Sequence, residues 1–544
     1  MLMRHAFLLG TLLVLAPLVA AGAEEAPYAD AAFQPPWVGK GLMAAERHPL
    51  PQADVEYYLE HLTTVTEYEY FKGYQPPPEE EKAHGGPLRI GENLPIDLGP
   101  EDIFLDWLPD GGRHVFMGAI RSLDAEGLRL EADISALAPT DELWVIDPEK
   151  PRAFGPYDPE EEGAEAKWLA SMSGDMAVLL VRSESAELPL VYLHTLAHFL
   201  EPPPQPKVLS CNINIACETR DGVLNAAAGV GVVLTTSSNG PIAASGALIN
   251  NPDIADPAPL FITAAHAIGN ESEARNAEIV WDYRAESCGE DDAPSFASLP
   301  RSDGKQLLAT DGDLDISLVL LDDVPDGPYG RTYLGWDTRS AETDEPVITI
   351  HHPDRSHMRI SYGHVTNPKE DAGNLGFKNQ IRVLWEEGVT EGGSSGSPLL
   401  ADDGAFRLLG VLSNGARHTC RGNNNWDRYA SFREFYPSVK TYVTGSLPID
   451  IGNGDNGNDA NGPGCPAELS LRDNPEALEH LRRLRDQGLL ESSVGQKAVD
   501  RYYEWAPSAT IFLHVFPRGK TAFRMGAAPF AWLGGLLGEE SAEE

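Results

Sequence analysis

Three short segments near the middle of the chain carry the residue types of nucleophilic catalysis. His266 follows the apolar run FITAA, Asp315 directly precedes the apolar run ISLVLL, and Ser395 lies within TEGGSSGSPLL. A histidine among small residues can approach a nucleophile, and a buried carboxylate can accept its imidazole N–H. Glycines let the backbone N–H groups of Gly393 and Ser395 point into one cavity that would bind an oxyanion. In this order the segments predict acyl transfer through a serine nucleophile.

Each segment alone has a structural explanation. A lone histidine after a strand is usually structural, an aspartate before a strand is usually a turn residue, and a Gly/Ser-rich run is usually a loop. The ordered combination with these flanks favours the catalytic interpretation.

The elements that must position these residues are short strands separated by turn signals. Residues 208–445 contain few long helical patterns, so this part is predicted to be all-β. Residues 85–200 show similar runs and predict an antiparallel β-sandwich, whereas Ala53–Tyr68 is expected to form a helix. The expected strands include Leu128–Ile134, Glu142–Ile146, Met176–Val181, Val230–Leu234, Leu260–Thr263, Ile316–Leu321, Val347–His351 and Leu408–Leu412.

Two stretches of unusual composition mark the ends of the folded part. The apolar run Phe7–Val19, followed by Ala21-Gly22-Ala23, predicts a cleaved export signal and therefore a secreted or periplasmic protein. The run IGNGDNGNDANGPG near residue 451 predicts a flexible linker. The expected parts are a signal peptide (1–23), a β-rich N-terminal domain that could be a propeptide (24–207), a catalytic domain (208–447), the linker (448–464) and a small helical C-terminal region (465–544).

The charge of the chain limits its partners. There are 41 Lys and Arg against 83 Asp and Glu, a formal net charge of −42. Nucleic acids and anionic membrane surfaces are bound through clustered cations, so neither is expected as a partner. Beyond the signal no apolar stretch approaches 18 residues, so stable membrane insertion is not expected either. The expected partners are protein or peptide substrates.

No metal site is predicted. The sequence contains no C-x-x-C pair, and the H-x-x-x-H at His194 and His198 lacks the glutamate that follows the first histidine in zinc peptidases. The predicted chemistry also needs no organic cofactor.

These motifs resemble those of a known family. TAAH at 263–266, DISL at 315–318 and GSSGSP at 393–398 are similar to the triad motifs of chymotrypsin-like serine peptidases, most closely those of bacterial lysyl endopeptidases. The resemblance covers about 208–445 and implies a double antiparallel β-barrel with the active site between the barrels. It extends through SCNINIAC, GWD, IHHP, GVTEGGSSGSPL and the DRY segment. The preceding sandwich resembles the β-rich region of such precursors, and the tail from Cys465 resembles a Cys-led C-terminal box of exported bacterial proteins.

The resemblance assigns the catalytic roles. His266 would accept the proton of Ser395 and later donate it to the leaving amine, while Asp315 orients the histidine. Ser395 would form an acyl-enzyme, and the N–H groups of Gly393 and Ser395 would stabilise the oxyanion.

The resemblance also implies a pocket for a basic side chain. Val389 stands at the pocket-floor position of trypsin and cannot pair with a cation, whereas Asp427 in the Asp-x-Tyr segment can. Cleavage after Lys is therefore expected. Ser413 replaces a family histidine, and no tryptophan occurs in 362–384, where the family has one lining the pocket. The expected pocket residues are Asp427, Thr390, Ser413 and Gly415.

An acidic preference stays open. Arg417 and His418 are expected near the pocket wall, and cations there would suit a specificity like that of glutamyl endopeptidases.

By resemblance, four of the five cysteines form two disulfides. The family pattern pairs Cys211 with Cys420 and Cys217 with Cys288. Alanines at 244 and 267 occupy both positions of a third family bridge. Cys465 is left over, and it could be free, pair between chains or be modified.

Two functions from different classes follow. The first is a secreted serine endopeptidase that cuts after Lys and could release residues 24–207 by cleaving between Lys207 and Val208. The second is a catalytically silent binding protein built on the same fold, with the sandwich as its recognition module.

Overall fold

The computed structural model describes residues 37–39, 50–68, 88–157, 166–200, 208–237, 240–251, 258–289, 292–373, 375–422 and 424–444. The chain divides into two units, Met1–Gly452 and Asn453–Glu544, and all described residues belong to the first. The predicted signal peptide, linker and helical C-terminal region lie outside the described residues, as do Lys207 and Cys465. Within the described ranges, no helix is long and apolar enough to cross a membrane.

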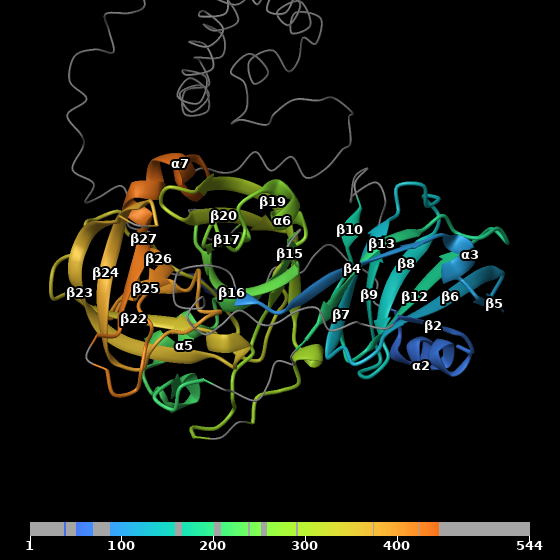
Figure 1. Cartoon of the computed structure of the whole chain (residues 1–544), viewed down its shortest axis with the longest axis horizontal. Coiled ribbons are helices and arrows are strands. Elements are labelled where there is room, and N and C mark those ends of the chain that lie inside the picture. Colours follow the sequence, from blue (N-terminus) through green and yellow to red (C-terminus); the bar gives the residue numbers. More distant parts are fainter. Residues whose placement is uncertain are drawn as a thin grey trace, which may run out of the picture. The chain divides into compact units, whose positions relative to one another are not determined.

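The N-terminal part is a β-sandwich (Figure 1). One sheet has the order β10-β7-β13-β4, with β11 also paired to β7, and the other has the order β2-β6-β12-β8-β9, with β5 also paired to β6. The first sheet comprises β4 (Gly91–Leu98), β7 (Gly127–Asp133), β10 (Lys167–Trp168), β11 (Met172–Ser173) and β13 (Tyr192–Phe199). The second comprises β2 (Val65–Tyr68), β5 (Asp106–Asp110), β6 (Arg113–Ser122), β8 (Glu142–Asp147), β9 (Arg152–Tyr157) and β12 (Met176–Ser183), with α3 (Pro100–Ile103) near β6.

Strand β12 explains why the predicted run Met176–Val181 is apolar at every position. Leu179 and Val181 face the sandwich core, whereas Val178 and Leu180 pack under α2 (Gln52–Glu60) on the other face of the sheet. A strand covered on both faces has no solvent side to mark with polar residues. The predicted helix Ala53–Tyr68 is too long, because the chain leaves α2 after Glu60 and continues into β2.

The next part contains the first of two closed barrels. Its strands run β15-β18-β19-β20-β17-β16, and pairing of β15 with β16 closes the ring. Strand β3 (Leu88–Arg89) adds to the outside of β16 at Ile242 and Ala243. The barrel strands are β15 (Val230–Ser237), β16 (Gly240–Ile249), β17 (Leu260–Thr263), β18 (Glu278–Val280), β19 (Arg301–Asp311) and β20 (Ile316–Leu321), with α5 (Asp221–Ala227) and α6 (Glu271–Arg275) nearby in sequence.

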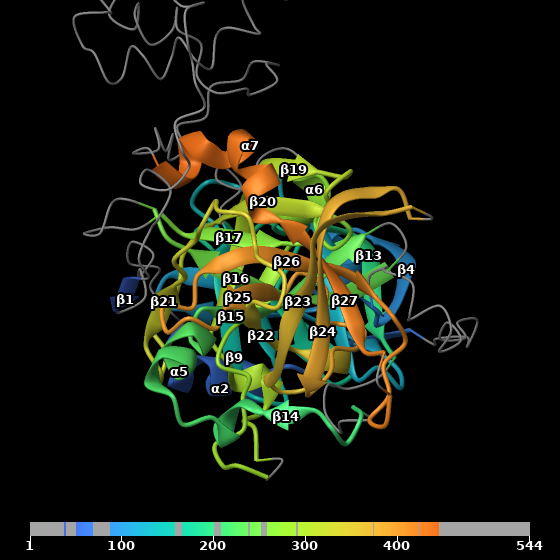
Figure 2. The same ribbon diagram turned by 90° about the vertical axis from the view of Figure 1, so that its left-hand side faces the viewer.

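The second barrel has the order β23-β22-β25-β26-β27-β24, closed by pairing of β23 with β24. Figure 2 shows β23, β24, β26 and β27 side by side in yellow and orange. The strands are β22 (Pro346–His351), β23 (Arg359–Ala372), β24 (Phe377–Glu387), β25 (Pro398–Ala401), β26 (Leu408–Gly415) and β27 (Trp426–Ser431), followed by α7 (Phe432–Thr444). The remaining elements are β1 (Trp37–Gly39) with β21 (Arg331–Tyr333), β14 (Ile213–Asn214) beside β23, and short 3-10 turns at Ile215–Cys217, Phe296–Ser298 and Pro353–Arg355.

One apolar core joins the two barrels. Ile262 and Leu318 of the first barrel lie in the same buried cluster as Ile350 and Val411 of the second. Phe435 of α7 completes this cluster. The mainly β fold with a sandwich and a double barrel is thus confirmed for the described part of the chain.

Polar side chains are buried where the sandwich meets the first barrel. Glu278 of β18 is fully buried; its carboxylate accepts hydrogen bonds from Arg301 at 2.7 Å and from the hydroxyl of Ser171 at 2.5 Å. Arg129 of the sandwich, also buried, donates to the carbonyl oxygen of Asn276 at 2.8 Å. Buried charges need such partners, so these contacts specify how the two parts meet.

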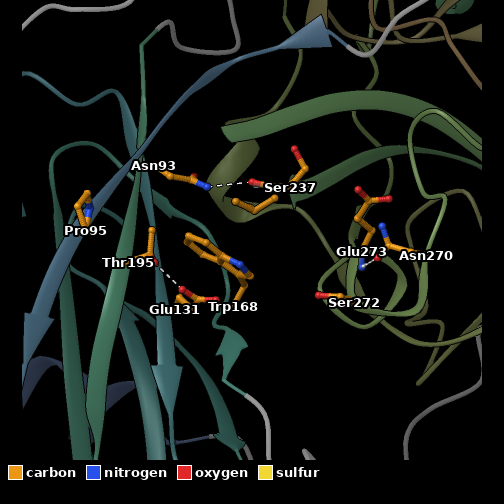
Figure 3. A pocket seen from close by; sticks show the side chains of 10 residues that line it. Asn93, Pro95, Glu131, Trp168, Thr195, Ser237, Asn270, Ser272 and Glu273 are labelled. Atoms are coloured by element: carbon orange, nitrogen blue, oxygen red, sulfur yellow. Dashed lines mark hydrogen bonds between the residues drawn. The ribbon is translucent and has the colours of Figure 1, made fainter. Parts of the chain in front are cut away.

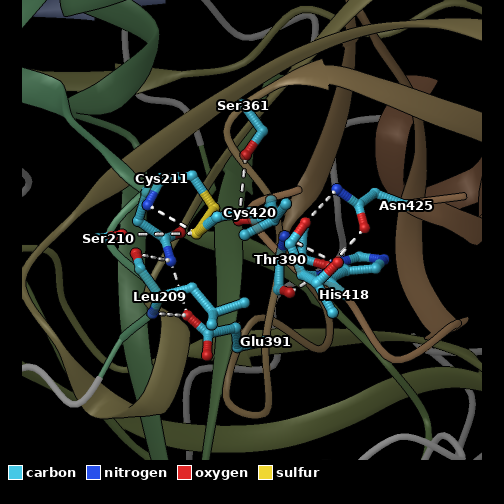
Figure 4. Close-up of a disulfide and its surroundings, with 12 residues drawn as sticks. Leu209, Ser210, Cys211, Ser361, Thr390, Glu391, His418, Cys420 and Asn425 are labelled. Atoms are coloured by element: carbon cyan, nitrogen blue, oxygen red, sulfur yellow. Dashed lines mark hydrogen bonds between the residues drawn. A yellow bond between two sulfur atoms is a disulfide. The ribbon is translucent and has the colours of Figure 1, made fainter. Parts of the chain in front are cut away.

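Two disulfides close long loops of the double-barrel region. They join Cys211 to Cys420 and Cys217 to Cys288, across sequence separations of 209 and 71 residues. Both pairs are those implied by the family resemblance. Figure 4 shows the first, which ties the start of this region to the loop between β26 and β27.

Removing one bridge should destabilise the protein without unfolding it under native conditions. The double variant Cys217→Ala/Cys288→Ala should lose about 3–5 kcal/mol of unfolding free energy, because a long loop gains freedom in the unfolded chain. Urea denaturation measures this loss, and non-reducing peptide mapping identifies the linked cysteines. A bond from Cys465 to any of the other four within a monomer would contradict the scheme.

Candidate active site

The end of β17 and the start of β20 bring His266 and Asp315 together. The Nδ1 atom of His266 lies 2.8 Å from Oδ2 of Asp315, and the backbone N–H of His266 donates to Oδ1 at 2.9 Å. These two contacts fix the orientation of the imidazole ring. The other ring nitrogen, Nε2, is buried and has no hydrogen-bond partner among the described residues. His266 can therefore accept a proton at Nε2 while Nδ1 stays bonded to the carboxylate.

Asp315 is held in a position where its carboxylate is almost inaccessible to solvent. Its φ angle is +67°, which aspartate tolerates better than most residues, and its N–H donates to the carbonyl of Asp311 at 2.8 Å. A third donor, the hydroxyl of Ser413 on β26, reaches Oδ2 at 2.6 Å. The carboxylate thus joins groups from both barrels.

The interaction between these two residues favours the charged form of each. Burial raises the pKa of Asp315, but the charge and hydrogen bonds of His266 outweigh burial, so the pKa lies below its ordinary value. Burial lowers the pKa of His266, but the carboxylate raises it by more. The carboxylate of Asp315 therefore favours the charged form of His266.

Glycines shape the loop that carries Ser395. Gly393 has φ +90°, and a Cβ there would lie 2.9 Å from the carbonyl oxygen of His352. Gly396 has φ +81°, and its Cβ would lie 2.2 Å from Oγ1 of Thr263, at the end of the strand that leads to His266. Both positions need glycine, and the second brings the loop against β17. Among the described residues, no backbone carbonyl accepts from the N–H groups of Gly393 and Ser395, the two donors predicted for an oxyanion.

Ser245 on β16 joins the first barrel to this loop. Its N–H donates to the carbonyl of Ser395 at 2.8 Å, and its hydroxyl donates to the carbonyl of Gly393 at 2.9 Å. The same hydroxyl accepts from the N–H of His352 at 3.0 Å. Ser245 lies outside the motifs that predict the site. The signal available was one hydroxyl in the otherwise apolar run PIAASGALI, at a position that is fully buried.

Asp427 lies on β27 with its carboxylate buried and bonded to three donors. Oδ2 accepts from Nε1 of Trp385 and from the hydroxyl of Thr390, each at 2.6 Å, and Oδ1 lies 3.1 Å from Nε2 of His418. A Cβ at Gly415 would lie 1.8 Å from Oδ1, so this position needs glycine. Thr390, Gly415 and Asp427 therefore come together. Ser413 is placed differently, because its hydroxyl donates to Asp315.

Trp385 and His418 both contact Asp427. The segment 362–384 contains no tryptophan, but Trp385 directly follows it. His418 has its Nδ1 at 2.7 Å from the carbonyl oxygen of Thr390 (Figure 4). Burial lowers the pKa of His418, but the charge of Asp427 outweighs burial and raises this pKa to about 9. This shift favours the imidazolium form of His418 at neutral pH.

Glu391 fastens the start of the double-barrel region to the Ser395 loop. Its carboxylate accepts from the N–H of Leu209 at 2.8 Å and from the amide of Asn212 at 2.6 Å (Figure 4). Burial raises the pKa of Glu391, although these hydrogen bonds oppose the change.

A separate cavity of about 580 Å³ lies where the sandwich meets the first barrel. None of the predicted site residues lines it. Figure 3 shows that Asn93 reaches across one side of it to the carbonyl of Ser237, at 2.9 Å. Its lining is Asn93, Pro95, Glu131, Trp168, Thr195, Thr236, Ser237, Asn270, Ser272 and Glu273.

The His418–Asp427 pair predicts a specific dependence of stability on pH. The folded-state pKa of His418 is raised from 6.5 to about 9, so its contribution is full below pH 6.5 and lost as pH rises through 9. The wild-type protein should lose roughly 3 kcal/mol more unfolding free energy than His418→Gln across this interval. Urea denaturation at several pH values measures the difference.

A surface histidine provides the control. His364 pairs with Glu386 at 3.2 Å where both side chains are partly exposed, so His364→Gln should keep the wild-type slope. Equal slopes for the wild-type protein and His418→Gln would contradict a buried charged pair.

Comparison of the sequence with known proteins finds the family that the motifs around His266, Asp315 and Ser395 resemble. Residues 207–430 match the family model described as lysyl endopeptidase, C-terminal domain. A lysyl endopeptidase of Pseudomonas aeruginosa is 31% identical over 245 residues, which are 43% of this chain and 51% of that protein. The chain thus spans about half the length of the curated relative it matches.

Solved structures with partial likeness are also proteases. The active form of the Rv3671c protease from M. tuberculosis shares 16% identity, covering 46% of this chain and 97% of that chain, with a TM-score of 0.29. The HtrA-type protease AlgW with a tripeptide shares 14% identity, covering 41% of this chain and 62% of that chain, with a TM-score of 0.29. The sequence comparisons show that residues 207–430 are similar to the C-terminal domain of lysyl endopeptidases, as their motifs predict.

Proposed function

We propose that this protein is a serine endopeptidase that uses Ser395, His266 and Asp315. The observation that carries the proposal is the buried His266–Asp315 pair, 2.8 Å apart, which leaves Nε2 of His266 without a partner among the described residues. Such an arrangement fixes the proton on Nδ1 and leaves Nε2 as the base. The similarity to lysyl endopeptidases supports the same reaction.

The proposed reaction has two stages. Nε2 of His266 accepts the proton of Ser395 while Oγ attacks the scissile carbonyl carbon. The oxyanion receives hydrogen bonds from the N–H groups of Gly393 and Ser395, and His266 then protonates the leaving amine. Water, activated by His266, hydrolyses the acyl-enzyme and restores Ser395. No metal or cofactor takes part in these steps.

Ser413 and Ser245 act as positioning residues in this mechanism. The hydroxyl of Ser413 holds Asp315 in the orientation that His266 needs. Ser245 binds the carbonyls of Gly393 and Ser395, which fixes the backbone of the loop that carries the N–H groups of these two residues. Preorganised donors of this kind are a major source of rate acceleration.

The proposed preference is for Lys before the scissile bond. Asp427 supplies a carboxylate beside Thr390 and Gly415, and the similarity to lysyl endopeptidases supports this choice. A glutamyl-type preference is the alternative, because His418 adds a cation to the same pocket.

Export and self-processing complete the proposal. The apolar N-terminal run and the two disulfides suit a secreted or periplasmic protein. Cleavage between Lys207 and Val208 would separate the sandwich from the catalytic domain. The buried contacts of Glu278 and Arg129 argue that the cut sandwich would remain bound until displaced.

Replacing the nucleophile or the base should abolish peptide hydrolysis in a folded protein. Ser395→Ala and His266→Ala should each lower kcat by at least roughly four orders of magnitude. Ser395→Ala should change thermal stability little, whereas His266→Ala should lower it, because the buried Asp315 loses a donor. Peptide turnover and circular dichroism measure the two properties. Ser298→Ala, at an exposed serine, should retain wild-type turnover. Wild-type turnover by Ser395→Ala would contradict the assignment of Ser395 as the nucleophile.

Self-processing should depend on the same serine. The wild-type protein should acquire a new N-terminus at Val208, whereas Ser395→Ala should remain uncut because it lacks the nucleophile. N-terminal sequencing of both proteins tests this. A fully active protein that still begins near Glu24 would show that residues 24–207 are a permanent domain.

A further inference from the structure

We propose that His418 determines specificity as the resident counter-ion of Asp427, so that the pocket presents a neutral pair and Lys binds only when His418 releases its proton. This inference rests on the proposed peptidase function. It concerns which side chain the pocket selects before the scissile bond.

The carboxylate of Asp427 is already fully engaged. Its two oxygens receive hydrogen bonds from Trp385, Thr390 and His418, on three different segments. The side chains of His418 and Asp427 are each 2% exposed. A free carboxylate at this depth would be costly, and the internal cation removes that cost.

The geometry of the imidazole ring indicates that both nitrogens carry hydrogen. Nδ1 lies 2.7 Å from the carbonyl oxygen of Thr390, and Nε2 lies 3.1 Å from Oδ1 of Asp427 and 3.3 Å from the carbonyl oxygen of Trp426. The N–H of Thr390 is also aimed at Nδ1, a bond that only a ring without hydrogen on Nδ1 could accept, but at 3.2 Å it is longer than the 2.7 Å contact that makes Nδ1 a donor. Two acceptors at opposite ends of the ring match an imidazolium.

The other titratable groups around His418 leave Asp427 as its main partner. Glu391 interacts with His418 by charge, but its carboxylate is bonded to Leu209 and Asn212. Burial lowers the pKa of His351 well below its ordinary value, so that ring stays neutral. Arg417 precedes His418 in the same loop.

Charge balance then couples lysine binding to proton release. A Lys ammonium group beside Asp427 would place two cations against one anion in a buried pocket. The Lys keeps its proton, whose ordinary pKa is about 10.4, and His418 gives its proton to solvent. An uncharged side chain of similar length, such as Gln, requires no proton release. The preference for Lys over Gln should therefore be weak at low pH and rise with pH.

Peptides that differ only in Lys or Gln before the scissile bond test this directly. In the wild-type protein, the Lys:Gln ratio of kcat/KM should rise by roughly tenfold per pH unit below the pKa of His418, because the neutral fraction rises by that factor. In His418→Gln the ratio should be about a hundredfold higher at neutral pH, which lies two units below the pKa of about 9, and nearly independent of pH. His364→Gln, which alters a surface pair, should behave like the wild-type protein.

The outcomes separate this inference from the proposed function. A wild-type Lys:Gln ratio that does not change with pH would overturn it, even if His418→Gln does not fold. Absence of cleavage of every peptide would instead count against the peptidase assignment. In that case NMR titration still shows whether His418 is protonated beside Asp427. A neutral His418 ring at about pH 7 would overturn the inference. An imidazolium that is lost in Asp427→Asn would support it.

Discussion

The buried carboxylate of Asp315 is the constraint on which the arrangement of the site depends. A charge at this depth is tolerated only when donors surround it, and its donors come from both barrels. His266 contributes two of them after β17, and Ser413 contributes a third from β26. The same contacts that satisfy Asp315 also orient the base and hold the ends of the two barrels together. The hydrogen bonds that make the burial of Asp315 tolerable are therefore the same ones that orient His266.

A second set of contacts places the Ser395 loop against the first barrel. Gly396 permits the close approach to Thr263, and Ser245 binds the two carbonyls on either side of Ser394. The apolar core shared by the barrels keeps β17, β20 and β26 in register, so small groups on separate strands meet within hydrogen-bonding distance. Rigid strands with a few short polar contacts thus position a loop that needs glycine to form.

Local sequence predicted most elements, because strands buried on both faces, such as β12 and β20, appear as continuous apolar runs. The residue types around His266, Asp315 and Ser395 predicted their chemistry because each motif is a short contiguous segment. Ser245 and Trp385 were missed because their contacts join segments distant in sequence. The pairing of His418 with Asp427 was missed because it depends on how the loop between β26 and β27 folds back. The length of α2 was overestimated, because the β-branched run Thr63–Thr66, which favours a strand, was included in the predicted helix.

Covalent labelling tests the central claim most directly. A peptidyl phosphonate reacts only with a serine hydroxyl that a neighbouring base activates and an oxyanion site supports. The account predicts one adduct per chain, located by peptide mass spectrometry on Ser395 and abolished in His266→Ala. A wild-type protein that is folded yet forms no adduct, or forms it on another serine, would contradict the account.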